Sequence, residues 1–201
     1  MRRFSFIVPI SALFWLFSAA LQATDLPLHF FEERVLSNLQ GPTYLVTLPS
    51  SEMILLEKHG AIKLFNPADS PPVLQDALNI PDVDSTGERG LTSAVLDPDF
   101  LANGFIYVYY QHIHDEETSY SRILRLTFEG TELSMDSAVV VWENNEAAHD
   151  CCHYGGGLDF GPDGMLYLTT GEEFQPEQSQ DLTRAGGKIC LLYTSPSPRD
   201  S

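Results

Sequence analysis

Residues 153–172, HYGGGLDFGPDGMLYLTTGE, decide the fold of this chain because they predict a β-hairpin. Apolar residues gather at 158–160 and again at 165–168, which favours two short strands. Between them stands the sequence Gly-Pro-Asp-Gly at 161–164, in which proline presets φ and glycine tolerates a positive φ. The chain is therefore expected to turn back on itself here.

The two ends of this hairpin carry His153 and Glu172, which the turn would bring close together. A carboxylate that accepts one imidazole N–H fixes the tautomer and leaves the other ring nitrogen free to take a proton. Glycine backbone at the start of the first strand can be approached closely by a flat ligand. We therefore take His153 and Glu172 as a candidate catalytic pair, and Gly155 and Gly156 as candidate binding backbone.

A second informative stretch lies upstream, where residues 87–100 read GERGLTSAVLDPDF and residues 103–110 read NGFIYVYY. It predicts a strand, a Pro-containing turn and an aromatic strand. Apolar runs at 43–48, 53–57 and 61–65 predict three earlier strands, and a further one is expected at 30–36. Many short strands with little helical periodicity favour an all-β fold.

Together, the two stretches resemble the glucose/sorbosone dehydrogenase family, the soluble quinoprotein sugar dehydrogenases. The family pattern is a His, a small residue and Gly, an apolar strand, Gly-Pro-Asp-Gly, a second strand and Gly-Asp. The chain follows it from His153 onward, with Glu172 in place of the final Asp and Gly157 where many members carry a larger residue. The resemblance covers most of residues 39–189.

This resemblance implies a six-bladed β-propeller, of which residues 24–189 would form an incomplete N-terminal part of about two to three blades. It implies oxidation of an aldose at its anomeric carbon to a lactone, with pyrroloquinoline quinone (PQQ) and calcium as cofactors. His153 would be the general base, hydride would pass to the quinone, and Glu172 would orient the imidazole. Residues at the positions of Glu88 and Arg89 would contact substrate or cofactor, although a simple surface ion pair is the alternative for these two.

Family members take most of the residues that grip the quinone and the calcium from later blades. The 201-residue chain is therefore expected to be inactive by itself. The alternative to an enzyme is a non-catalytic extracellular binding propeller, because hedgehog-interacting proteins also resemble residues 87–100. The pair at 153 and 172 favours the enzyme.

The first 23 residues predict a secretory signal peptide, with Arg2 and Arg3 before an apolar run and small residues from Ser18 to Ala23. A retained membrane anchor is the alternative, but the apolar run is short and interrupted. A formal net charge of −17 argues against nucleic acid or anionic membrane as a partner. We therefore expect an exported protein, periplasmic or secreted, that acts on a small sugar without stable membrane insertion.

Three cysteines are present, and two of them are adjacent, Cys151 and Cys152. Export permits a disulfide, although neighbouring Cα atoms lie only about 3.8 Å apart, which makes a vicinal bridge strained. A bridge between the two remains as open as the alternative, in which one or both thiols are free or bonded to something outside this chain. The closing stretch at 190–201 departs abruptly from the family pattern and resembles a translated sequencing adapter, so we expect it to be a non-native tail.

Overall fold

The computed structural model describes residues 26–144, 146–147 and 152–193. The expected signal peptide at 1–23 and residues 194–201 of the expected tail lie outside this part. The chain divides into two compact units, one ending at Arg34 and the other beginning at Val35. The described residues of the first unit contain a turn in which the Phe30 N–H donates to the Pro27 carbonyl at 3.0 Å.

The strand predicted at 30–36 is wrong, because the structure has no strand there. The side chains of Phe30 and Phe31 are exposed rather than packed on a neighbouring strand. Strand propensity measures the fit of a side chain to a pleated, half-buried surface, and an apolar run without such a surface does not form a strand.

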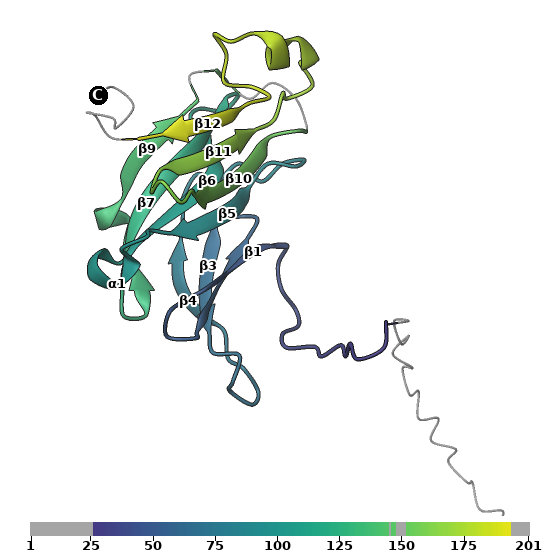
Figure 1. Cartoon of the computed structure of the whole chain (residues 1–201), viewed down its shortest axis with the longest axis vertical. Coiled ribbons are helices and arrows are strands. Elements are labelled where there is room, and N and C mark those ends of the chain that lie inside the picture. The colour runs from purple at the N-terminus through teal and green to yellow at the C-terminus, as the bar shows by residue number, and fades with distance from the viewer. Residues whose placement is uncertain (1–25, 145, 148–151, 194–201) are drawn as a thin grey trace, which may run out of the picture. The chain divides into compact units, whose positions relative to one another are not determined.

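From Val35 onward, the described residues form successive antiparallel sheets with very little helix (Figure 1). The strands predicted at 43–48, 53–57 and 61–65 are confirmed. They belong to a first sheet of order β1-β2-β3-β4, with β1 at Pro42–Thr47, β2 at Met53–Glu57, β3 at Ala61–Phe65 and β4 at Gln75–Asn79.

The second sheet follows the order β5-β6-β7-β8, with β9 also paired to β7. A one-turn helix α1 connects β5 to β6 and ends at Gly104, whose left-handed φ of 66° lets its N–H cap the Phe100 carbonyl. The elements are β5 Leu91–Leu96, α1 Phe100–Asn103, β6 Phe105–Ile113, β7 Ser119–Glu129, β8 Glu132–Leu133, the 3₁₀ turn η1 Met135–Ser137 and β9 Val139–Glu143.

The third sheet has the order β10-β11-β12 and contains the predicted hairpin. Its turn is confirmed: the Gly164 N–H donates to the Gly161 carbonyl at 2.9 Å, and Gly164 has a φ of 74°. Strand β12 continues beyond Ile189 to Leu192, within the stretch expected to be a tail. The elements are β10 Gly155–Phe160, β11 Leu166–Thr170, the 3₁₀ turn η2 Pro176–Gln180 and β12 Ile189–Leu192.

Two apolar clusters join the three sheets. One is built from the first and second sheets and includes Leu64 and Ile106. The other lies between the second and third sheets and includes Tyr109, Ile123 and Leu168, each fully buried. Each sheet therefore buries its faces against its neighbours in chain order, as propeller blades do. The chain is an all-β, incomplete β-propeller of about two to three blades.

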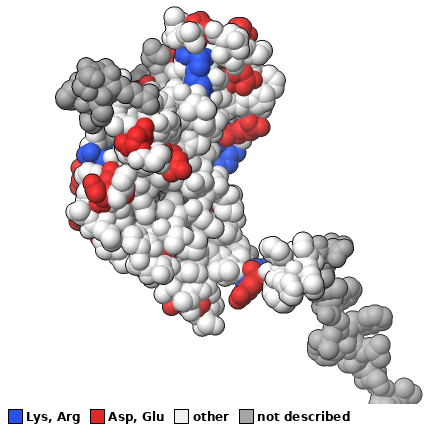
Figure 2. All heavy atoms as spheres, in the orientation of Figure 1, with Lys and Arg blue, Asp and Glu red and all other residues white. Residues whose placement is uncertain are grey.

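Acidic side chains are spread over the face seen in Figure 2, with Lys and Arg among them. Among the described residues, no helix combines the length and the apolar character needed to cross a bilayer.

Candidate active site

The register of the β10–β11 hairpin determines which residues lie opposite each other at its open end. Leu158 pairs with Leu168, and Gly155 pairs with Thr170, so the summed residue numbers change from 326 (158 + 168) to 325 (155 + 170). A β-bulge at Gly156 and Gly157 causes this shift of one residue. Extending the shifted pairing to 153 places Glu172 opposite His153, because 153 + 172 is also 325. Without the bulge, the residue opposite would be Glu173.

The two predicted residues meet at this end of the hairpin. His153 Nδ1 lies 2.6 Å from Glu172 Oε1, with relative side-chain exposures of 49% and 24%. An acceptor at Nδ1 places the ring proton there and leaves Nε2 as the nitrogen that can take a proton from a ligand. The half-exposed ring is accessible to a small molecule.

The same contact shifts both protonation equilibria. The hydrogen bond to Glu172 is the main cause that raises the pKa of His153 above its ordinary 6.5; lost hydration opposes it, and the charges of Glu172 and Glu88 add to it. The hydrogen bond from His153 is likewise the main cause that lowers the pKa of Glu172 below 4.5. Opposite shifts of this kind are expected for an imidazolium–carboxylate pair.

The predicted residue Glu88 lies at the same place. It comes from the loop before β5, and its Oε2 accepts the backbone N–H of His153 at 2.8 Å. His153 has a φ of 65°, a left-handed value that is uncommon for residues other than glycine. The Glu88 carboxylate therefore ties down the backbone of His153 at a strained position.

Arg89 points to other partners. Its Nε donates to the Tyr154 hydroxyl at 2.8 Å, and its Nη1 donates to Asp84 Oδ2 at 3.0 Å. Its guanidinium also lies 5.1 Å from the centre of the Tyr154 ring. Arg89 thus forms its ion pair with Asp84. Glu88 contacts His153 and Arg89 contacts Tyr154, so the loop before β5 is linked to two neighbouring residues of the His153 segment.

The glycines of the motif make close contacts within the chain. Gly155 is exposed, whereas Gly156 is buried, and a Cβ at Gly156 would come within 2.6 Å of the Tyr109 ring. A Cβ at Gly171 would lie 1.5 Å from the His153 carbonyl oxygen. A Cβ at Gly155 would likewise lie 2.6 Å from the Gly171 backbone nitrogen. Packing alone thus requires glycine at 155, 156 and 171, and a cofactor-binding role for Gly155 and Gly156 remains a prediction.

Sequence reasoning missed Phe174 and Tyr154. The ring of Phe174 stacks on the imidazole of His153, with centroids 4.6 Å apart and an interplanar angle of 17°. Tyr154 is buried, and its carbonyl accepts the Tyr109 hydroxyl at 3.0 Å. Both are aromatic residues within two positions of the predicted pair, and that proximity was the available signal.

The cysteine prediction falls partly outside the described residues, because Cys151 is not among them. Cys152 is disulfide-bonded, and Cys190 is a free thiol.

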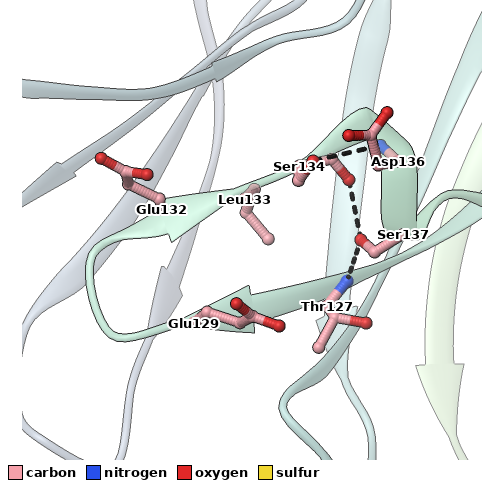
Figure 3. Close-up of a pocket in the computed structure, with 7 residues that line it drawn as sticks. All are labelled: Thr127, Glu129, Glu132, Leu133, Ser134, Asp136 and Ser137. Carbon is pink, nitrogen blue, oxygen red and sulfur yellow. Dashed lines mark hydrogen bonds between the residues drawn. The ribbon is translucent and has the colours of Figure 1, made fainter.

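The described residues leave an exposed approach to His153 and gather no cluster of metal ligands. Gly155 and His153 are both exposed, so a flat ring could approach their outer face. The missing Cβ of Gly155 adds no room for it, because a Cβ there would lie 2.6 Å from the Gly171 backbone nitrogen. Nowhere in the described part do three or more His, Cys, Asp or Glu side chains converge as metal ligands. The pocket lined by Glu129, Glu132 and Asp136 is acidic, but these three side chains do not form such a cluster (Figure 3).

Residues 39–200 match the family described as Glucose / Sorbosone dehydrogenase. The chain belongs to this family. Its Glucose / Sorbosone dehydrogenase core thus contains all three sheets, and the resemblance seen in the sequence is confirmed.

Three matches illustrate the relationship. The aldose sugar dehydrogenase YliI of Escherichia coli K12 is 26% identical over 191 residues, covering 95% of this chain and 50% of the relative. The solved PQQ-bound aldose sugar dehydrogenase of Streptomyces coelicolor is 27% identical with a TM-score of 0.71, covering 83% of this chain and 49% of that one. The hedgehog-interacting protein of Mus musculus is 30% identical over 156 residues, covering 70% of this chain and 22% of the relative. The chain thus spans half or less of the length of these relatives.

Proposed function

We propose that this protein is a quinone-dependent oxidoreductase that oxidises an aldose, or a similar sugar, at its anomeric carbon to a lactone. The observation that carries the proposal is the His153–Glu172 contact of 2.6 Å at the exposed end of a glycine-rich strand. Family membership supports the same chemistry, as do the names of the related aldose sugar dehydrogenases.

In this proposal, His153 Nε2 is the general base. It accepts the proton of the anomeric hydroxyl, so an O–H bond breaks and an N–H bond forms. PQQ, when bound, supplies the acceptor for the hydride that leaves the anomeric carbon. A base must be unprotonated to act, and the raised pKa of His153 makes it a stronger base but requires a higher pH to free it.

Glu172 holds the imidazole in one tautomer and stabilises the imidazolium that forms when the proton arrives. Glu88 fixes the backbone from which the ring projects. Arg89 supports the neighbouring residue Tyr154 through its side-chain hydroxyl. We place the sugar and the edge of the quinone next to His153 and Gly155, which are both exposed.

The chain as given would bind the cofactors weakly and would not turn over. The carboxylates of PQQ need cations, but Arg89 is engaged with Asp84, and Lys188 donates to the carbonyls of Gln178 and Gly186. Calcium has no carboxylate cluster among the described residues. We propose that residues beyond this chain complete both sites and that residues 1–23 direct export.

A dye-linked aldose oxidation assay with added PQQ and calcium tests both parts of the proposal. A version of the protein that spans the length of its relatives is expected to oxidise aldoses, and the 201-residue chain is not. Replacing His153 with Ala in the long version should lower kcat by roughly 10²–10⁴-fold, the usual contribution of a general base. Unchanged activity would remove His153 as the base, and clear activity of the 201-residue chain would refute its proposed inactivity.

A non-catalytic binding propeller remains the second candidate, supported by the match to the hedgehog-interacting protein. The same assay separates the two functions. If the long version folds and binds no PQQ and oxidises no aldose, the binding function replaces the enzymatic one.

A further inference from the structure

Phe174 occupies a position that does not favour a large side chain. The Gln175 N–H donates to the Glu172 carbonyl at 2.8 Å and closes a four-residue turn. The two central residues, Glu173 and Phe174, have φ values of 52° and 60°. Two successive positive φ values are typical of a type I′ turn, whose central positions favour Asn and Gly. An aromatic residue therefore destabilises this turn locally.

Burial does not compensate for this strain. Half of the Phe174 side chain, 53% of its surface, remains exposed. The hydrophobic effect scales with the apolar area removed from water, so Phe174 gains much less than a core aromatic residue. Strained residues that persist in a fold often cluster at functional sites, which directs attention to the one ring contact of Phe174 that the structure records.

That contact is the stack on His153, at 4.6 Å and 17°. It complements the other two restraints on this residue. Glu172 holds the edge of the ring through Nδ1, and Glu88 holds the backbone N–H. Neither restraint covers a ring face, whereas a parallel aromatic ring resists rotation of the imidazole out of its plane.

We propose that Phe174 is a positioning residue that holds the plane of the His153 imidazole and thereby aims Nε2 at the substrate. This inference rests on the proposed function of His153 as the general base. Reaction rates depend steeply on the orientation of the catalytic group, so a ring held at one edge only would be a poorer base. On this proposal, the backbone strain at residue 174 lowers the stability of the fold but is retained because the aromatic ring serves catalysis.

The Phe174 ring should also affect the charge of the His153 imidazole on which it stacks. An aromatic face attracts a cation, so the stack favours the imidazolium in addition to the carboxylates of Glu172 and Glu88. Removing the aromatic ring should lower the pKa of His153 in the same direction as removing Glu172, but to a smaller extent.

Proton NMR of the 201-residue chain tests the proposal without cofactor or substrate. The chain has six histidines, and the loss of one set of signals in a His153→Gln variant assigns the ring protons of His153. In the wild type, these protons should be shifted upfield by the ring current of Phe174. Phe174→Asn introduces a residue that suits the turn better, so the fold should be as stable as before or more stable, while the His153 signals move downfield and the His153 pKa falls.

Three further variants complete the design. Phe174→Tyr keeps the aromatic face and should restore the wild-type signals and pKa. Leu182→Ala removes another exposed apolar side chain, 92% exposed, and should change neither. If Phe174→Asn loses the native spectrum, Phe174→Leu gives the same comparison, because it keeps apolar bulk without a π face.

Wild-type shifts and pKa in the Asn or Leu variant would overturn the positioning role, even if His153 proves essential for oxidation. Loss of the stack in these variants, together with full activity of His153→Ala in the long protein, would instead refute the proposed function and leave the contact as a structural one. In the long protein, Phe174→Leu should lower kcat more than it raises KM, since the residue acts through the base.

Discussion

At the residue scale, the protonation of His153 should control activity. In Glu172→Gln, the His153 pKa should fall toward 6.5, because the amide carries no charge and makes a weaker hydrogen bond. The acidic limb of the kcat/KM profile should therefore move to lower pH in the long protein. Its plateau should also drop, by less than the roughly 10²–10⁴-fold contribution of a general base. Glu177→Gln, which changes an exposed acid in the following turn, is the matched control and should leave the profile unchanged.

The same pair makes stability depend on pH. The raised pKa of His153 gives a contribution that is complete below 6.5 and is lost as pH rises through the folded value. The lowered pKa of Glu172 gives a contribution that is complete above 4.5 and is lost as pH falls through the folded value. The pair should therefore contribute most between pH 4.5 and 6.5. Urea unfolding across this range should show the largest difference between wild type and Glu172→Gln there, and a constant difference would contradict the pairing.

Glu88 should act mainly as an acceptor for the His153 backbone. Glu88→Gln keeps an acceptor oxygen, whereas Glu88→Ala leaves the N–H without its partner and should destabilise the site by about 1 kcal/mol. In amide hydrogen exchange, the His153 amide should exchange faster in the Ala variant than in the Gln variant. Equal protection in both would show that the hydrogen bond at 2.8 Å does not hold the strained backbone.

At the element scale, the hairpin shows what sequence reasoning could and could not provide. Alternating apolar runs and the Gly-Pro-Asp-Gly turn were enough to predict β10 and β11, and the hairpin was enough to expect His153 near an acid. The pattern alone does not reveal the bulge at Gly156 and Gly157, because the close approach of Tyr109 to Gly156 involves a strand of another sheet. The hairpin and the family resemblance both pointed to Glu172, and the bulge supplies the register that places Glu172, rather than Glu173, opposite His153.

The close approach of Gly171 to the His153 carbonyl gives a prediction for the whole hairpin. A Cβ in Gly171→Ala would overlap the His153 carbonyl oxygen, so the strand ends must separate, at a cost of about 3 kcal/mol, the upper part of the range for overpacking. The His153–Glu172 contact should be lost with it. Gly164→Ala is the control in the same hairpin: its Cβ meets nothing within 4 Å, so only the left-handed conformation is penalised, by about 1 kcal/mol. Similar unfolding free energies for the two variants would argue against the close approach at Gly171.

At the scale of the whole molecule, the site depends on the packing between sheets. In the described part of the chain, the third sheet packs on the second through the cluster of Leu168 and Tyr109, whereas Leu64 belongs to the cluster between the first and second sheets. Energetics in repeat folds are approximately sums of nearest-neighbour terms. Leu168→Ala and Leu64→Ala should each cost about 2–5 kcal/mol of unfolding free energy.

The two variants should nevertheless differ at the site. Leu168→Ala loosens the sheet that carries His153, so it should broaden or shift the His153 ring signals under native conditions. Leu64→Ala lies one interface away and should leave them unchanged. Urea unfolding, followed by the fluorescence of Trp142 packed against the Leu168 cluster, gives the free energies independently of the NMR signals. If Leu64→Ala disturbs His153 as much as Leu168→Ala does, the sheets behave as one cooperative body, and the geometry of the base is controlled by the whole fold and not by its nearest interface.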